Sequence, residues 1–278
     1  MIHKTYRWKT KDKKTLFAQC WKPEEESKKT VLMIHGLGEH SGRYERWGKM
    51  FVGEGFNFLS FDLRGHGKTS GKRAYAKSLE VLLNDIDLVF SKAEKMFKDS
   101  KFVLYGHSMG GNLALNHIII RNHPVDALVV SSPWLKMAKE PPGPLLAIAS
   151  FGSKFLPRLT LNSKLDLNNR SHDPQVELEF QKDQLNFKKI SFRLFHEMYQ
   201  AGYHALRNVY KINYPFLLMH GTEDKITSHK ASEKFVMNTC ARTKLKLWEG
   251  QYHELHNELI YEDVFRYVID WLKSHDIY

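Results

Sequence analysis

The pattern Gly-x-Ser-x-Gly, centred on Ser108, is the clearest chemical signal in the chain. Its two glycines leave room for a sharp turn that strains the serine backbone and pushes the hydroxyl outward. The apolar run 102–105 before it is typical of a buried strand, and 112–120 after it fits a buried helix. Strand, turn and helix in this order indicate a nucleophile elbow, in which the backbone N–H of Met109 points at the same place. An ordinary glycine-rich turn is the alternative, because three fixed positions recur by chance.

A serine nucleophile needs a base that takes its proton and a carboxylate that orients the base. Candidates follow two later predicted strands: Asp224 comes after the first, an apolar run, and His253 comes after the second. Their order along the chain, Ser then Asp then His, is the order found in hydrolases with such an elbow. Two neighbours leave the assignment open at this point, because Glu223 precedes the aspartate and His256 lies three residues beyond the histidine.

A loop with closely spaced glycines, residues 36–42, follows the buried strand predicted over 31–34. In elbow hydrolases the loop after this strand supplies a second backbone N–H for the oxyanion, one residue past His-Gly. That residue is Leu37, so Leu37 and Met109 are the predicted oxyanion donors. Without the serine elbow, a plain strand-to-helix loop would be the better interpretation.

The elements that must position these residues alternate between strand and helix. Strands are expected over 4–8, 15–21, 31–34, 56–61, 102–105, 127–131, 215–221 and 244–248. Helices are expected over 44–52, 79–97, 112–120, 228–241 and 258–274. This alternation predicts an α/β fold with a mostly parallel sheet and helices on both faces. All three candidate residues would then lie at the carboxyl edge of the sheet, where ligands bind in open α/β sheets.

The alternation stops at residues 137–212, where the sequence shows no clear strand and several prolines open the segment. We interpret this segment as a helical cap that lies over the carboxyl edge of the sheet. The core would then consist of residues 1–136 and 213–278.

Bulk composition narrows the functional class. The 278 residues include no apolar stretch of the roughly 20 residues that span a bilayer, and the polar start lacks the apolar core of a signal peptide, so a cytoplasmic location is expected. The net charge is +11, but Lys and Arg are scattered, so nucleic-acid binding is not expected. No His, Cys or carboxylate cluster has metal-ligand spacing, so neither a metal nor a cofactor is expected. The cysteines Cys20 and Cys240 are expected to be reduced.

Five segments carry a family resemblance that spans about residues 15–272. They are His35-Gly36-Leu37-Gly38-Glu39-His40-Ser41-Gly42-Arg43-Tyr44, Asp62-Leu63-Arg64-Gly65-His66-Gly67, Gly106 to Gly111, Gly221-Thr222-Glu223-Asp224, and Gly250-Gln251-Tyr252-His253-Glu254-Leu255-His256. The chain resembles the monoacylglycerol lipase and lysophospholipase branch of the α/β-hydrolases, also grouped as serine aminopeptidase-like hydrolases. The resemblance implies an α/β-hydrolase fold with Ser108 as nucleophile, Asp224 as acid, His253 as base, and Leu37 and Met109 as oxyanion donors. The family spacings Gly-x-x-Asp and Gly-x-x-His select these residues over their neighbours.

The stretch 144–161 within the predicted cap is rich in Leu, Ile, Ala and Phe, and it carries Lys154 and Arg158 but no acidic residue. Such a stretch could line a tunnel for one acyl chain and rest on an anionic membrane surface. The alternative is that its apolar face packs on the sheet edge. Its large apolar residues are Leu145, Leu146, Ile148, Phe151, Phe155, Leu156, Leu159 and Leu161.

The expected function is therefore hydrolysis of esters of single-chain lipids, either monoacylglycerols or lysophospholipids, through an acyl-enzyme on Ser108. The alternative within this class is hydrolysis of a short ester, thioester or amide. An alternative of another class is a non-catalytic lipid-binding or scaffold protein, since a fold alone does not fix function. The intact set of triad residues argues against that last alternative.

Overall fold

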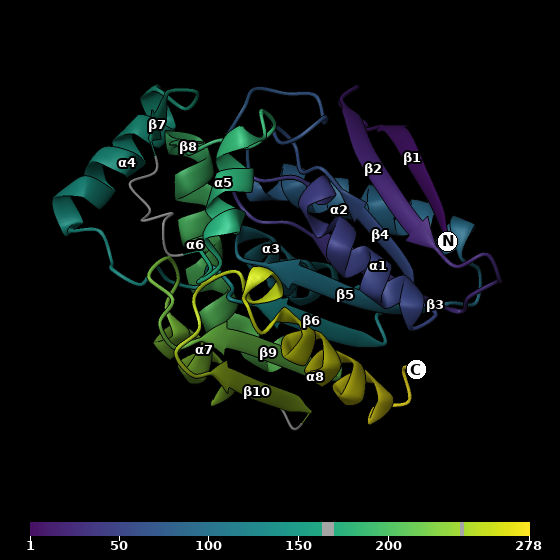
Figure 1. The fold of residues 1–278 in the computed structure, drawn as a ribbon. Helices are drawn as coiled ribbons and strands as arrows, with labels where there is room; N and C mark the ends of the chain where they lie inside the picture. The colour runs from purple at the N-terminus through teal and green to yellow at the C-terminus, as the bar shows by residue number, and fades with distance from the viewer. Residues whose placement is uncertain (163–169, 240–241) are drawn as a thin grey trace.

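A computed structural model describes residues 1–162, 170–239 and 242–278 of the chain. Its main sheet runs in the order β1-β2-β4-β3-β5-β6-β9-β10 (Figure 1). The strands are β1 (Ile2–Lys9), β2 (Thr15–Lys22), β3 (Lys29–Ile34), β4 (Asn57–Phe61), β5 (Lys101–His107), β6 (Ala127–Ser131), β9 (Phe216–Gly221) and β10 (Thr243–Trp248). Only the β1–β2 and β2–β4 pairings of this sheet are antiparallel. The predicted mostly parallel α/β fold is confirmed.

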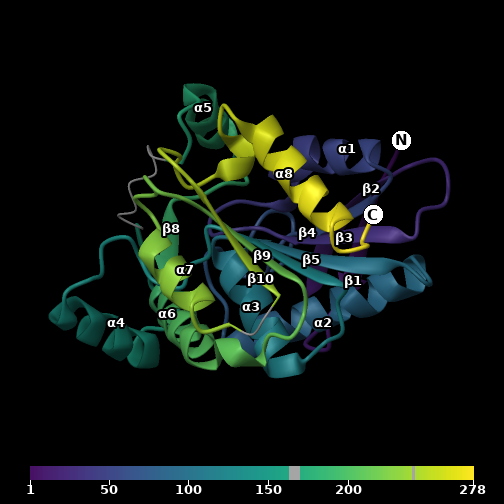
Figure 2. The same ribbon diagram turned by 90° about the horizontal axis from the view of Figure 1, so that it is seen from below.

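Helices cover both faces of the sheet (Figure 2). Those that pack on it are α1 (Glu45–Gly53) and α8 (Tyr261–Lys273) on one face, with α2 (Leu79–Met96), α3 (Met109–Arg121) and α7 (His229–Val236) on the other. Helix α3 is buried almost throughout, because the sheet packs against one side of it and α6 (Phe192–Asn208) packs against another. The strand that ends at the elbow serine therefore lies between two buried layers, which hold it rigidly.

Two predicted helix boundaries in the C-terminal part are wrong. Helix α7 ends at Val236 rather than continuing to 241, and residues 240–241 lie outside the described part of the chain. The side chains of Asn238 and Thr239 bond to the carbonyls of the preceding turn, which offers the backbone an alternative to a longer helix. Helix α8 begins at Tyr261 instead of 258, after the short 3-10 helix η4 (Leu255–Asn257).

The segment between β6 and β9 is mainly helical, as predicted. It contains α4 (Gly143–Phe155), α5 (Pro174–Lys182), α6 and the 3-10 helix η3 (Val209–Lys211). The sequence shows no clear strand here, but the structure contains two short ones, β7 (Thr160–Asn162) and β8 (Lys189–Ser191), which pair antiparallel. Strands of three residues are too short to show an alternating pattern, and their pairing joins distant parts of the sequence. Residues 163–169 of the predicted cap lie outside the described residues.

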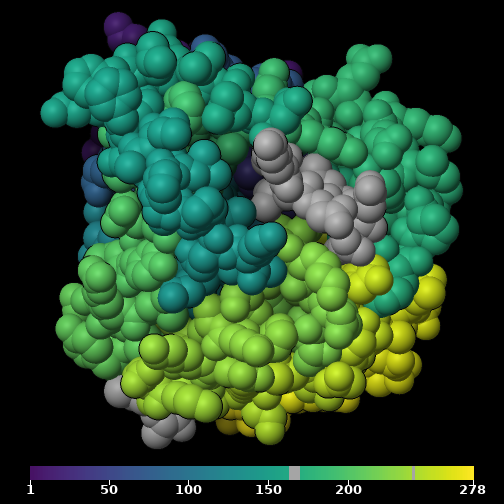
Figure 3. All heavy atoms as spheres, turned by 90° about the vertical axis from the view of Figure 1, so that its left-hand side faces the viewer, coloured from purple at the N-terminus to yellow at the C-terminus, as the bar shows by residue number. Residues whose placement is uncertain are grey.

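Helix α4 lies at the surface of the molecule (Figure 3), with small residues buried and most of its large apolar residues exposed. Ala149, Gly152 and Ser153 are its buried residues, and a Cβ on Gly152 would come within 2.7 Å of the Phe192 ring of α6. Of the eight large apolar residues between 144 and 161, seven have 47 to 63% of their surface exposed, and Leu146 is half-buried. The alternative that this stretch packs on the sheet edge is therefore wrong, because close contact with α6 uses only small residues.

Candidate active site

The elbow at the end of β5 has the strained geometry that the Gly-x-Ser-x-Gly pattern predicts. Ser108 has φ 55° and ψ −118°, and α3 begins at the next residue. A Cβ on Gly106 would lie 2.6 Å from the carbonyl oxygen of Gly110. A Cβ on Gly110 would collide with the carbonyl oxygen of Ile34 in β3. Both glycines are therefore required by close backbone approach, which lets the strained serine present its hydroxyl at the sheet edge.

His253 joins the serine to an aspartate. Its Nε2 lies 2.9 Å from Ser108 Oγ, and its Nδ1 lies 2.6 Å from Asp224 Oδ2. The three residues are buried and come from the loops that follow β5, β9 and β10. A neutral imidazole in this position donates its Nδ1–H to the carboxylate and accepts the serine proton at Nε2. This is the arrangement that activates a hydroxyl as a nucleophile.

The Asp224 carboxylate is held by four donors besides His253. Its Oδ1 accepts the backbone N–H groups of Ile226 at 2.7 Å and Thr227 at 2.9 Å. Its Oδ2 accepts the Thr227 hydroxyl at 2.8 Å and lies 3.0 Å from His220 Nε2. Burial opposes ionisation, but His253 and His220 outweigh it and hold the pKa of this carboxyl well below its usual range. The group therefore stays a carboxylate and keeps one orientation toward the base.

The two competing residues lie elsewhere. The Glu223 side chain is 52% exposed and pairs with a lysine at the surface. His256 is buried and stacks on the Tyr44 ring at 4.8 Å, and burial lowers its pKa to about 4. The geometry therefore brings Asp224 and His253 to the serine, and it gives Glu223 and His256 other surroundings.

The loop after β3 lies against the elbow. A Cβ on Gly36 would come within 3.1 Å of Ser108 Cβ, and Leu37 lines the same cavity as the serine. The Glu39 carboxylate accepts the Gly36 N–H and so fixes the loop. Met109 is the first residue of α3, where a backbone N–H has no acceptor within the helix. The predicted oxyanion donors, Leu37 and Met109, are therefore adjacent to Ser108 in space.

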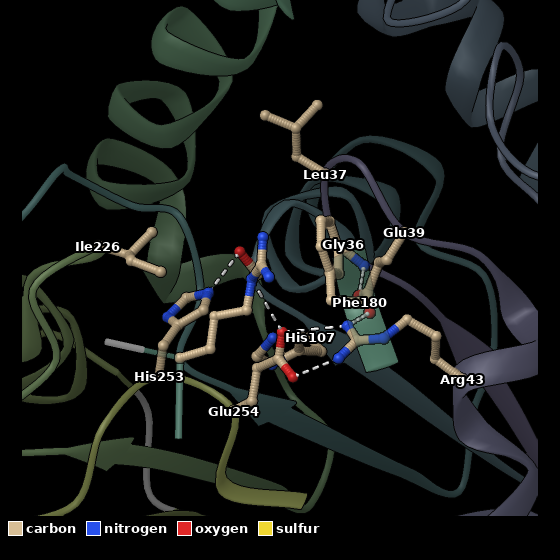
Figure 4. Close-up of a pocket in the computed structure, with 11 residues that line it drawn as sticks. Gly36, Leu37, Glu39, Arg43, His107, Phe180, Ile226, His253 and Glu254 are labelled. Carbon is tan, nitrogen blue, oxygen red and sulfur yellow. Dashed lines mark hydrogen bonds and ion pairs between the residues drawn. The ribbon is translucent and has the colours of Figure 1, made fainter. Parts of the chain in front are cut away.

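A cavity of about 30 Å³ lies against Ser108 and His253 (Figure 4). This volume is more than the roughly 10–15 Å³ that one water molecule needs on the same measure. Its apolar lining residues are Leu37, Phe180 and Ile226, and its charged ones are Glu39, Arg43, Arg170 and Glu254. None of the large apolar residues of the α4 stretch is among the described residues that line this cavity, so an acyl tunnel lined by that stretch stays a prediction.

The four charged lining residues form one network. Arg43 donates to both oxygens of Glu254, at 3.0 and 2.7 Å, and to Glu39 at 2.6 Å. Arg170 donates to Glu177 at 2.7 Å, and its Nε lies 3.5 Å from Glu254. Burial opposes ionisation of Glu254, but Arg43 lowers its pKa well below the usual range. Each carboxylate on the wall is therefore ionised and matched by a guanidinium.

Sequence reasoning missed Arg170, Phe180 and Glu254 as residues of the site. Glu254 carries a signal, because it directly follows the predicted base. Arg170 and Phe180 lie in the inserted segment, where no pattern pointed to them; the Arg170 guanidinium stacks on the Phe180 ring at 3.4 Å. Among the described residues, no group of three His, Cys, Asp or Glu side chains is placed to hold a metal ion. Cys20 is buried with a free thiol, and Cys240 lies outside the described residues.

Similar sequences, a similar solved structure and a family profile all relate this chain to known hydrolases. An abhydrolase domain-containing protein of Dictyostelium discoideum is 39% identical over 95% of this chain, which spans 28% of that longer protein. The monoglyceride lipase of Saccharomyces cerevisiae is 30% identical over 88% of this chain and 84% of its own length. The crystal structure of a soluble variant of that yeast lipase with a substrate analog superposes with a TM-score of 0.89 at 26% identity, covering 99% of this chain and 96% of the other. The family profile described as serine aminopeptidase S33 matches residues 25–260, and with the α/β-hydrolase fold in place the chain belongs to that family of hydrolases.

Proposed function

We propose that this protein hydrolyses esters of single-chain lipids, with Ser108 as nucleophile, His253 as base and Asp224 as the acid that orients the base. The observation that carries the proposal is the buried hydrogen-bond chain from Asp224 through His253 to the strained Ser108. The fold alone would not support it, because related folds serve many reactions.

The proposal gives each group a role that its position supports. His253 Nε2 takes the Ser108 proton as Oγ attacks the ester carbonyl, and the backbone N–H groups of Leu37 and Met109 hold the resulting oxyanion. His253 then gives the proton to the leaving alcohol, which departs and leaves the acyl group on the serine. A water in the cavity gives a proton to His253 as it attacks this ester, and His253 passes that proton to Ser108 Oγ as the fatty acid is released. The cavity volume of about 30 Å³ suits that water.

The substrate class rests on two supports. Relatives over most of the chain are named monoglyceride lipases, in mouse, human and yeast among others. Four charged side chains line part of the cavity beside the serine, which suits the alcohol side of a glycerol ester better than a second acyl chain. Monoacylglycerols should therefore be hydrolysed faster than di- and triacylglycerols.

A substrate panel tests this proposal. We would measure kcat/KM for mono-, di- and trioleoylglycerol and for p-nitrophenyl esters of increasing chain length. Monooleoylglycerol should be the best glyceride, and kcat/KM should rise with chain length, since each buried CH₂ contributes about 0.8 kcal/mol. Preference for acetyl or butyryl esters with no activity on monoacylglycerol would overturn the lipid assignment and favour the short-ester alternative.

We also propose that residues 137–212 act as a cap that brings the site to an anionic membrane. The support is the exposed apolar surface of α4 and the turn after it, which includes Ile148, Phe151 and Phe155. Lys154 and Arg158 accompany this surface and are exposed. Contiguous exposed apolar side chains on a soluble domain mark interaction sites, and basic residues add about 1 kcal/mol each near an anionic surface. No helix among the described residues is long and apolar enough to cross a membrane.

Vesicle sedimentation tests the membrane contact. Vesicles containing phosphatidylserine should bind the protein more than pure phosphatidylcholine vesicles, and binding should weaken with salt. Phe151→Glu and the double change Lys154→Glu with Arg158→Glu should both reduce binding. Met237→Glu is the matched control, because Met237 is 82% exposed at the end of α7. Equal binding by all variants, or binding insensitive to salt, would overturn this contact.

A further inference from the structure

The wall of the cavity beside His253 is charged but balanced. Glu39 and Glu254 supply two negative charges, and Arg43 and Arg170 supply two positive ones, so the described part of the wall has no net charge. All four residues are largely buried, and Glu254 is 3% exposed. An acyl chain would gain little against such a wall, because burying methylene groups beside ion pairs removes water from the charges.

The leaving alcohol must lie on this side of the serine. His253 Nε2 gives the alcohol oxygen its proton, so that oxygen must come within hydrogen-bond reach of Nε2 when the ester bond breaks. Glu254 follows His253 directly in the chain, and both line the cavity. Whatever the alcohol carries is therefore brought close to the Glu254 carboxylate and the Arg170 guanidinium.

We propose that Glu254 and Arg170 make this site selective for an uncharged polyol head group, and that Glu254 is the residue that rejects a phosphate-bearing one. The proposal rests on the ester hydrolysis proposed above and narrows it, because it favours monoacylglycerols over lysophospholipids. Both guanidinium groups are already matched: Arg43 binds Glu254 and Glu39, and Arg170 binds Glu177 and lies beside Glu254.

A phosphate could bind only by displacing a carboxylate from one of these guanidinium groups. The displaced carboxylate would remain buried without its partner, which is costly. Polyol hydroxyls carry no such cost, since each can donate to a carboxylate oxygen and accept from a guanidinium N–H. The ion-paired wall thus discriminates by charge, although it contains two arginines.

The Glu254→Gln variant tests this directly. It changes the described wall from neutral to a net positive charge, yet leaves Arg43 paired with Glu39 and Arg170 paired with Glu177. The substrates are 1-oleoylglycerol and 1-oleoylglycerol 3-phosphate, which share the acyl chain and the scissile ester. The readout is the ratio of their kcat/KM values, in which any general loss of activity cancels.

We expect the unmutated protein to prefer the uncharged ester, and Glu254→Gln to shift the ratio toward the phosphate by about tenfold, which corresponds to about 1.4 kcal/mol. The shift should lie mainly in KM. Arg170→Gln should shift the ratio the opposite way, and it keeps the test open if Glu254→Gln does not fold. Glu223→Gln is the matched control, because it removes the same charge from an exposed position outside the cavity lining.

The outcomes separate the two proposals. Turnover of neither ester by the unmutated protein would overturn the proposed lipid-ester hydrolysis and this inference with it. Turnover of 1-oleoylglycerol with a ratio that Glu254→Gln and Arg170→Gln leave unchanged would overturn the inference alone. A shift of the same size in Glu223→Gln would show that overall protein charge sets the preference, which would also overturn it.

Discussion

Replacing Asp224 by asparagine keeps the shape of the side chain and reverses half of its hydrogen-bonding character. Both carboxylate oxygens accept from donors: Oδ1 from two backbone N–H groups, and Oδ2 from the Thr227 hydroxyl and from imidazole nitrogens. An asparagine amide has one accepting oxygen and one donating NH₂ group. In either orientation, the NH₂ group therefore faces groups that also donate.

This conflict sets the size of two losses, one in kcat and one in stability. With NH₂ toward His253, the imidazole is driven to the tautomer that carries its proton on Nε2, so it can no longer accept the Ser108 proton. The equivalent change in a serine protease triad lowers kcat about 10⁴-fold, and we expect a loss of that order here. With NH₂ toward the backbone, buried donors are left unsatisfied at about 1–3 kcal/mol. Asp224→Asn should therefore lose stability as well as activity.

Steady-state hydrolysis of a p-nitrophenyl ester, read beside thermal unfolding, checks this prediction. The matched control is Glu223→Gln, the same chemical change at the adjacent, half-exposed acid. That control should keep kcat within about twofold and Tm within about 2 °C, since surface ion pairs contribute about 0–1 kcal/mol. A kcat loss below tenfold in Asp224→Asn, or an equal loss in the control, would refute the reasoning.

Three further predictions follow from the surroundings of other residues. His253→Ala should lower kcat by about 10⁴-fold or more, whereas His256→Ala should leave the kcat of folded protein within about tenfold; the reverse order would show that the base is misassigned. Gly110→Ala should lower the free energy of unfolding by about 3 kcal/mol or prevent folding, because the new Cβ would meet a backbone carbonyl. Gly53→Ala is the control: its Cβ would have nothing within 4 Å, so thermal unfolding should show a neutral or slightly stabilising effect. Burial opposes ionisation of Glu39, but the Arg43 guanidinium lowers its pKa from 4.5 to about 2. The stability that this gives is present above about pH 4.5 and is lost as the pH falls toward 2. Between these pH values, the Tm of the unmutated protein should therefore fall more than the Tm of Glu39→Gln.

The sequence predicted the site best where few backbone conformations are possible. The spacing around Ser108 demands a strained turn. Ser108 and Asp224 each follow a strongly apolar strand, whereas the strand before His253 carries two lysines. Parallel strands bring their carboxyl ends to one edge, so residues 145 positions apart meet without any pairwise signal in the sequence. The choice of Asp224 over Glu223 needed the family spacing, and burial in the structure agrees with it.

The inserted segment was predicted less well, for physical reasons. Large apolar residues normally mark a buried face, but α4 reaches its neighbour through Ala149, Gly152 and Ser153, so its Leu and Phe side chains stay outside. Three-residue strands carry no pattern of their own. Arg170 becomes a residue of the site only through tertiary contact with Glu254 and Phe180. Such contacts depend on how the segment folds back over the sheet, which local sequence does not specify.

The central claim is that Ser108 is an activated nucleophile, and covalent labelling tests it most directly. We would treat the folded protein with a fluorophosphonate and locate the adduct by mass spectrometry of its peptides. The account predicts one adduct, on Ser108, that is lost in Ser108→Ala together with hydrolysis of monooleoylglycerol. The hydrogen-bond chain from Asp224 predicts that His253→Ala will also label poorly, although its serine is intact. An adduct on another residue, or undiminished hydrolysis by Ser108→Ala, would contradict the account.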